Sequence, residues 1–165
     1  LHDFNAFTAS VCNLRPSSRG SVHISSTNCN AAPVITTNYL STPEDCKVAA
    51  ESLVLTRKIV ASKAFQAFHP EEYKPGTQFQ SNAELISAAR DIGTTIFHPV
   101  GTCKMGIKED PQAVLDAQLR VHGIFNLRIA DASAMPFITS GNTAAPTMMI
   151  AERLAELLQK KSSNG

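Results

Sequence analysis

The sequence lacks tryptophan, has only two tyrosines among its 165 residues, and carries no excess of charge of either sign. Its basic and acidic residues nearly balance at a formal net charge of +1, without the basic stripe of a nucleic-acid-binding surface. No apolar run approaches the roughly 20 residues needed to cross a bilayer. We therefore expect no nucleic-acid partner and no place in a membrane. The 43% hydrophobic and 18% charged residues are typical of a folded globular chain.

Cysteine is also scarce, with four residues at Cys12, Cys29, Cys46 and Cys103. No two of them form a C-x-x-C pair, which is the usual arrangement of a structural zinc site or a redox-active dithiol. We therefore expect no bound metal. Four cysteines can also pair as two disulfides, but the chain is not cysteine-dense and its composition favours free thiols.

The two ends of the sequence differ in character. It opens at Leu1 with neither an initiator methionine nor the charged and apolar segments of a signal peptide. We therefore expect the chain to be a piece of a longer protein. At the other end, a helix is expected to run into a polar tail over residues 160–165, which is typical of a natural C-terminus. Neither end indicates a cellular compartment.

Short β-strands are expected in the first third of the chain. Residues 5–14 alternate in part between apolar and polar side chains. Residues 21–26 place two β-branched side chains on one face, as in a half-buried strand. The turn-like residues 15–20 would join these two strands. A further extended piece is expected at 34–36.

Three helices are expected in the remainder. The first begins at a capping Thr42, and its apolar repeat continues to about Phe68. Ser81 and Glu84 have the spacing of a capping box and open a shorter helix. The last helix is expected over residues 146–160.

Three short stretches carry residues suited to chemistry. Residues 97–102 hold His98 before a proline, and histidine is the usual general base near neutral pH. Residues 127–131 form a short apolar run that ends in an acid, typical of a buried strand opening into a nucleotide site, and small residues follow as far as 136. Residues 140–147 place Asn142 at the positive end of the last helix. Taken singly, the first and third stretches are more typical of ordinary structure, and the small residues of the second also occur in ordinary packing.

The same stretches occur in an order that is typical of one enzyme family. The segments concerned are 15–20 (R-P-S-S-R-G), 98–106 (H-P-V-G-T-C-K-M-G), 119–123 (L-R-V-H-G), 127–133 (L-R-I-A-D-A-S) and 141–147 (G-N-T-A-A-P-T). In these segments the chain resembles the glucose-methanol-choline (GMC) oxidoreductase family. The resemblance extends over nearly the whole chain and is most specific from 97 to 155.

The resemblance implies FAD as the cofactor and an alcohol as the substrate. It implies that His98 accepts the hydroxyl proton while hydride passes from the alcohol carbon to the flavin. Asn142 occupies the second site position, where an amide holds the substrate oxygen by hydrogen bonds, as in the choline-oxidising branch. The residues implied to contact the cofactor are Pro99, Val100, Asp131, Ala132, Asn142 and Thr143.

The resemblance also implies an α+β fold in two parts. Residues 1–93 are expected to form part of a substrate-binding domain, an antiparallel sheet with covering helices. Residues 94–165 are expected to supply the C-terminal strand and helix of an FAD-binding α/β domain. The sequence has no G-x-G-x-x-G fingerprint for the dinucleotide. We therefore expect the missing N-terminal FAD-binding portion of the same protein as the partner, and an inactive chain without it.

Two alternatives to alcohol oxidation stay open at this point. A hydroxynitrile-lyase-like member of the family would use the same scaffold and also need a base, whereas the decarboxylating type lacks the histidine found here at His98. A non-catalytic binding fragment would leave His98 and Asn142 facing away from each other. Neither the particular alcohol nor the electron acceptor follows from the sequence.

Overall fold

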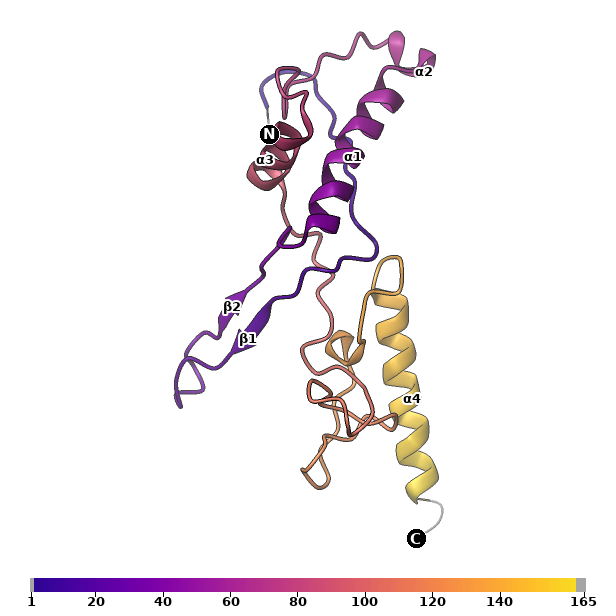
Figure 1. Cartoon of the computed structure of the whole chain (residues 1–165). Coiled ribbons are helices and arrows are strands. Elements are labelled where there is room, and N and C mark those ends of the chain that lie inside the picture. The colour runs from indigo at the N-terminus through magenta and orange to yellow at the C-terminus, as the bar shows by residue number, and fades with distance from the viewer. Residues whose placement is uncertain (1, 163–165) are drawn as a thin grey trace. The chain divides into compact units, whose positions relative to one another are not determined.

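The computed structural model describes residues 2–162, which form helices and a two-stranded sheet, an α+β arrangement (Figure 1). The elements are β1 (Ser21–His23), β2 (Val34–Thr36), α1 (Pro43–Val60), α2 (Lys63–Gln66), α3 (Asn82–Ile92), the 3₁₀ helix η1 (Ala132–Ala134) and α4 (Ala144–Ser162). The chain divides into two compact units. The first holds the chain up to Gly20 and Thr36–Ile96, and the second holds Ser21–Ile35 and the chain from Phe97 onward.

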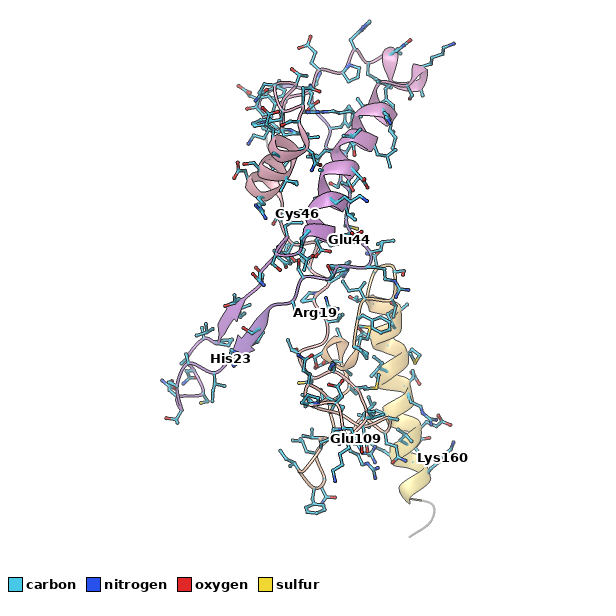
Figure 2. The ribbon with its side chains drawn as sticks, viewed as in Figure 1. Arg19, His23, Glu44, Cys46, Glu109 and Lys160 are labelled. Carbon is cyan, nitrogen blue, oxygen red and sulfur yellow. The ribbon has the colours of Figure 1, made fainter. Side chains whose placement is uncertain are left out.

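The start of α1 follows from local chemistry. Thr42 has an extended backbone, and its side-chain oxygen accepts a hydrogen bond from the backbone N of Asp45 at 3.3 Å. Pro43 needs no N–H in the first turn, and Glu44 lies beside it near the positive end of the helix dipole (Figure 2). The predicted start at Thr42 is confirmed.

Asp45 fastens the turn over residues 15–20 to this end of α1. Its side chain is buried, and its carboxylate accepts from the backbone N of Ser17 at 2.9 Å and of Ser18 at 2.8 Å. Burial raises the pKa of Asp45, but the hydrogen bonds from Ser18 and Ser17 outweigh that effect and leave the pKa below its ordinary value. The R-P-S-S-R-G turn is therefore held by an ionised carboxylate.

α1 and α3 pack against each other in the first unit. Their buried apolar residues are mostly small and comprise Cys46, Ala50, Leu85, Ala88 and Ala89. At the start of α3, the Ser81 side chain accepts from the backbone N of Glu84, and the Glu84 carboxylate accepts from the backbone N of Ser81 at 2.8 Å. The predicted capping box is confirmed.

α1 ends at Val60, so the predicted continuous helix to Phe68 is wrong. Ser62 has an extended backbone, with ψ at 157°, and it precedes the four-residue α2. The ring of Phe65 on α2 stacks on Phe7, with centroids 5.7 Å apart. Apolar periodicity indicates only which face of a helix is buried, so a contact with a segment far away in the sequence cannot be predicted from it.

Arg57 joins the last turn of α1 to the segment that precedes α3. Its Nε and Nη2 donate to the two carboxylate oxygens of Glu72 at 2.9 and 2.8 Å. The same guanidinium donates to the carbonyls of Gly76 at 3.0 Å and Phe79 at 2.8 Å. The hydrogen bonds from Arg57 hold the pKa of Glu72 below its ordinary value of 4.5, against the opposing effect of burial.

β1 and β2 form a hairpin, with His23 at the end of β1 (Figure 2). Ser25 Oγ donates to the carbonyl of Ala32 at 2.7 Å and helps to close the connecting loop. An added Cβ at Gly20 would lie 2.2 Å from the carbonyl oxygen of Thr36, so only glycine permits this approach. The predicted extended piece at 34–36 is confirmed.

Two other expectations for this region are wrong. Residues 5–14 form no strand, although their composition favours one. Residues 21–26 have no half-buried face, since Val22 is 46% exposed and Ile24 is 87% exposed. Strand propensity is realised only where neighbouring strands pair with and cover the segment, and within the described residues β1 pairs only with β2.

Residues 119–121 and 127–129 of the second unit are joined by a single antiparallel bridge between Arg120 and Arg128. The backbone N of Val121 donates to the carbonyl of Leu127 at 3.0 Å, and that of Ile129 donates to the carbonyl of Leu119 at 3.1 Å. The buried strand predicted at 127–131 is therefore reduced to an isolated bridge, and Leu127 is 44% exposed. A buried parallel strand needs strands on both sides, which the described residues do not provide.

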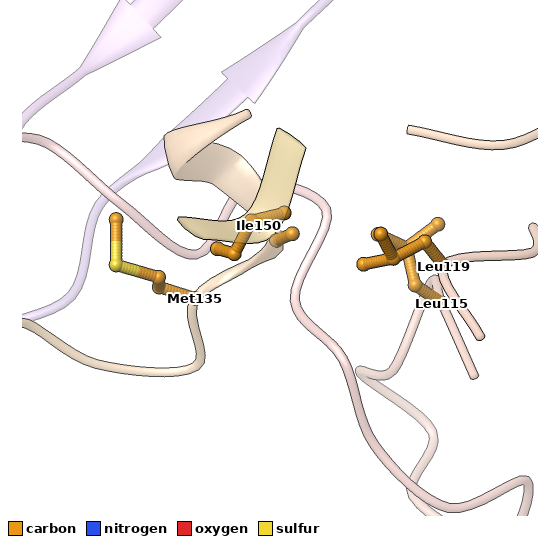
Figure 3. Packing of buried hydrophobic residues seen from close by; sticks show 5 residues of the cluster. Leu115, Leu119, Met135 and Ile150 are labelled. Carbon is orange, nitrogen blue, oxygen red and sulfur yellow. The ribbon is translucent and has the colours of Figure 1, made fainter. Parts of the chain in front are cut away.

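The hydrophobic core of the second unit joins its loops to α4 (Figure 3). Its buried members are Leu115, Leu119, Ala134, Met135 and Ile150. Ala134 lies in η1 and Met135 follows it, whereas Ile150 lies on α4. This shared burial fixes the segment after residue 131 against the last helix, with Leu115 fully buried at the same cluster.

α4 begins two residues before the predicted start and runs to Ser162, with Lys160 near its end (Figure 2). The polar tail predicted over 160–165 therefore lies partly in the helix, and residues 163–165 lie outside the described residues. None of the helices in residues 2–162 is both long and apolar enough to cross a membrane.

Candidate active site

His98 lies on a loop of the second unit that is tied to the segment around η1. The backbone N of Cys103 donates to the carbonyl of Ser133 at 3.1 Å, and that of Met105 donates to the carbonyl of Ala134 at 2.9 Å. Backbone hydrogen bonds thus join two of the stretches that the sequence singled out, since one begins at His98 and the other contains η1. The loop is held by main-chain contacts whose geometry does not depend on side-chain identity.

The ring of His98 contacts the third stretch through both of its nitrogens. Its Nε2 lies 2.9 Å from Nδ2 of Asn142, and its Nδ1 lies 3.0 Å from Oγ1 of Thr143. Asn142 is exposed, His98 is half-buried and Thr143 is only 7% exposed. The structure therefore brings a potential base and a side-chain amide together at one place, in contrast to the arrangement expected of the non-catalytic alternative.

The backbone is strained on both sides of this contact. Phe97, directly before His98, has φ of 65°, and Ser140, two residues before Asn142, has φ of 64°. Left-handed backbone costs a non-glycine residue about 1–2 kcal/mol, and such positions cluster at functional sites. Neither position was predictable from the sequence, because phenylalanine and serine do not mark a left-handed backbone.

The other predicted cofactor residues lie nearby and serve the local structure. Asp131 Oδ1 accepts from the backbone N of Ser133 at 2.8 Å and caps η1. Val100 and Ala132 are half-buried and pack against the core cluster, while Pro99 is exposed. None of these contacts conflicts with a role in cofactor binding, and for all four residues that role stays a prediction.

The positive end of α4 opens beside Asn142. The backbone N of Thr147 donates to the carbonyl of Thr143 at 3.0 Å, which makes Thr143 the residue that precedes the helix. Ala144 and Ala145 are exposed, and a Cβ added to Gly141 would meet nothing within 4 Å. First-turn N–H groups have no partner inside a helix, so this end can receive an anion or the polar edge of a ring.

The other histidines are not drawn into this arrangement. His23 is exposed on β1, and His122 Nε2 lies 3.3 Å from the carbonyl oxygen of Gly106. All four cysteines are free, and residues 2–162 contain no group of three side chains able to hold a metal ion. The chemistry of the site thus depends on an imidazole, an amide, a hydroxyl and a helix end.

Sequence reasoning missed the contact between Thr143 and the ring of His98. The resemblance assigned Thr143 to the cofactor, whereas its hydroxyl lies at hydrogen-bond distance from Nδ1. The available signal was weak and consisted of its position between Asn142 and Pro146, at the start of a helix. Only the fold places it beside a residue 45 positions away.

Comparison with known proteins identifies the family of the chain. The family model described as GMC oxidoreductase matches residues 16–151. The chain is 41% identical over 155 residues to the alcohol dehydrogenase [acceptor] of Pseudomonas putida, and this match covers 94% of the chain and 28% of that protein. It is 42% identical over 154 residues to the mitochondrial choline dehydrogenase of Mus musculus, covering 93% of this chain and 26% of the relative.

Solved structures give the same result. The pyridoxine 4-oxidase of Mesorbium loti matches with a TM-score of 0.81 and 37% identity, over 87% of this chain and 28% of that one. An FAD-dependent oxidoreductase of Chaetomium thermophilum matches with a TM-score of 0.84 and 31% identity, over 91% of this chain and 26% of that one. The chain thus spans 26–28% of the length of these four relatives. With a family model matched over most of its residues, the chain belongs to the GMC oxidoreductase family.

Proposed function

We propose that the protein containing this chain is an FAD-dependent oxidoreductase that oxidises the CH–OH group of an alcohol, with His98 as base. The observation that carries this proposal is the 2.9 Å contact between His98 Nε2 and Asn142 Nδ2. An imidazole nitrogen accepts protons near neutral pH, and an amide N–H donates to oxygen. Together they can hold a hydroxyl group by a hydrogen bond and accept its proton.

The residues present fit FAD as the cofactor. The exposed small residues at the start of α4 leave its first-turn N–H groups open, and these would face the polar edge of the flavin, which becomes anionic on reduction. Asn142 and Thr143 would lie on that side, and Pro99, Val100, Asp131 and Ala132 would complete this chain's contacts to the cofactor. When bound, FAD supplies the acceptor for the hydride that leaves the alcohol carbon.

The chain's own residues handle the substrate oxygen and its proton. The hydroxyl oxygen replaces the direct contact between His98 and Asn142, accepting a hydrogen bond from Asn142 Nδ2. The hydroxyl proton passes to Nε2 of His98, and the ring becomes an imidazolium. Because the substrate oxygen and the accepting nitrogen are both held, the proton moves over a short hydrogen-bond distance.

The relatives support oxidation over lyase chemistry, since those compared above are named as dehydrogenases, an oxidase and an oxidoreductase. Addition of an alcohol without oxygen separates the two activities. An oxidoreductase bleaches its flavin under these conditions, whereas a hydroxynitrile-lyase-like protein leaves the flavin oxidised.

The proposal includes a division of the chain between two domains. Residues 1–93 would form part of the substrate-binding domain, in which β1 and β2 would join further strands into an antiparallel sheet covered by helices. Residues 94–165 would return to the FAD-binding domain, where 127–131 would pair with strands from the missing N-terminal portion. The exposed apolar side chains of Val22 and Ile24 support this, because helices covering the face of such a sheet would bury them.

The test compares two histidine variants of the complete FAD-containing protein. We expect His98→Ala to slow flavin reduction by alcohol by about 100-fold or more, the usual contribution of a general base. The matched control, His23→Ala, removes an exposed ring on β1 and should leave the rate within about twofold of wild type. Near-normal flavin reduction by His98→Ala with FAD still bound would remove His98 from the reaction.

A further inference from the structure

We propose that Thr143 is a positioning residue that holds His98 in the tautomer whose proton is on Nδ1, so that Nε2 is free to act as the base. The inference deepens the proposed function and rests on it. It starts from the two contacts of the ring, 2.9 Å to Asn142 Nδ2 and 3.0 Å to Thr143 Oγ1.

The chemistry of the two partners assigns the ring proton. An amide nitrogen can only donate, so Nε2 facing Asn142 Nδ2 must accept and carries a lone pair. A neutral imidazole with a lone pair on Nε2 has its proton on Nδ1. The Nδ1–H group then donates a hydrogen bond to Oγ1 of Thr143.

Thr143 is placed so that its hydroxyl oxygen is available for this purpose. A residue before a helix usually accepts from the backbone N–H three residues on, but that residue here is Pro146, which has none. The Thr143 carbonyl accepts from the backbone N of Thr147 at 3.0 Å and from the Thr147 hydroxyl at 2.6 Å. A β-branched side chain on such a fixed backbone has few rotamers, so Oγ1 is held in place.

Burial strengthens the case for a fixed hydrogen bond. Thr143 is one of two buried polar or charged residues among those described, with Asp45 in the other unit. A buried hydroxyl needs a hydrogen-bond partner, and the ring of His98 supplies it. The contact therefore restrains both the rotation of the ring and the position of its proton.

The hydrogen bond to Thr143 stabilises the ring of His98 both before and after Nε2 accepts the proton. When Nε2 accepts the alcohol proton, Nδ1–H continues to donate to Thr143 Oγ1, and the bond becomes stronger because the donor is now charged. Thr143 itself neither gains nor loses a proton. Without the hydroxyl, the ring is free to rotate or to carry its proton on Nε2, which blocks the base.

The test uses the complete FAD-containing protein with Thr143→Val, which removes the hydroxyl at nearly constant shape, and Thr143→Ser, which keeps it. We expect Thr143→Val to lower kcat about tenfold with little change in KM, as for an interaction used in the reaction and not in substrate binding. Thr143→Ser should restore kcat to within about threefold of wild type. Equal losses in the Val and Ser variants would overturn the proposal, because the hydroxyl that Ser keeps would then give no advantage over Val, which lacks it.

A double variant asks whether Thr143 acts through His98. In a His98→Ala background, Thr143→Val should cause no further loss, since effects of residues that act as one unit are not additive. A full additional loss would mean that Thr143 acts independently. The control Thr56→Val removes a half-buried hydroxyl that donates to a carbonyl of its own helix, Ser52, and should leave kcat within about twofold of wild type.

The tautomer can also be observed directly by ¹⁵N NMR of histidine-labelled protein, with His98 assigned from its Ala variant. We expect an Nδ1-protonated ring in the wild type and a shift towards Nε2-protonation in Thr143→Val. An Nε2-protonated ring in the wild type would contradict the inference. If His98→Ala stays active the proposed function fails, whereas an inactive His98→Ala with a normal Thr143→Val removes only the role of Thr143.

Discussion

The amide of Asn142 faces Nε2 of His98 over 2.9 Å, although the two residues are separated by 44 positions in the sequence. The contact defines the place of a substrate oxygen, since both atoms would turn to that oxygen when a hydroxyl group enters. Because an amide cannot take a proton at neutral pH, the pair holds a single base.

Replacement of Asn142 tests its half of this relationship. In the complete protein we expect Asn142→Ala to lower kcat/KM for the alcohol by about tenfold, the equivalent of one hydrogen bond to the substrate oxygen. Steady-state kinetics with the alcohol measures this, and Asn5→Ala, which truncates an exposed amide, is the control. An unchanged kcat/KM in Asn142→Ala would show that the amide does not hold the substrate.

The isolated 165-residue chain should not retain a cofactor. It lacks a G-x-G-x-x-G fingerprint and spans 26–28% of the compared relatives, so the contacts to the dinucleotide half of FAD would come mainly from elsewhere. We expect the purified chain to show no flavin absorbance after gel filtration in the presence of added FAD. Stoichiometric flavin on this chain would contradict the assignment of the missing portion as the partner.

The pair formed by Arg57 and Glu72 predicts a dependence of stability on pH. Arg57 holds the pKa of Glu72 below 4.5, so the stabilisation is complete above that value and is lost as the pH falls through the lower pKa of the folded state. At pH 7, Glu72→Gln should cost about 1.5–3 kcal/mol, the range for hydrogen bonds to a charged group, with both side chains less than a quarter exposed.

Thermal unfolding of the complete protein at several pH values measures this effect. The difference in Tm between wild type and Glu72→Gln should be largest near neutral pH and should shrink in acid, where Glu72 of the wild type is protonated. The control is Glu51→Gln, because Glu51 is 66% exposed and lies 4.0 Å from Lys47. A Tm difference that is constant across the pH range would show that the effect is not due to the carboxylate.

The features that were predictable from sequence are those set by a few neighbouring residues. The starts of α1 and α3 follow from Thr42 and from the Ser81–Glu84 capping box, because caps satisfy N–H groups within the same turn. Family membership was also predictable, since five short segments in a fixed order carry it. The ends of elements were less predictable, as the break after Val60 shows.

Strand predictions failed where the described residues provide no neighbouring strand or only a single bridge. Residues 5–14 have the composition of a strand and no strand beside them, and 127–131 are reduced to a bridge with the neighbouring 119–121. A strand is stabilised by its neighbours, whereas a helix satisfies its own backbone. Local composition therefore predicts where strands are possible and not which ones form.

The sequence by itself determined the family, the choice of His98 and Asn142 as candidates, and the helix that begins beside them. Only the tertiary structure decided that Asn142 faces Nε2 and that Thr143 faces Nδ1. It also decided that Phe97 and Ser140 adopt left-handed backbone at the two approaches to the contact. The reason is physical: caps and periodicity act within a few residues, whereas the orientation of a ring depends on groups that packing brings together across 44 and 45 positions.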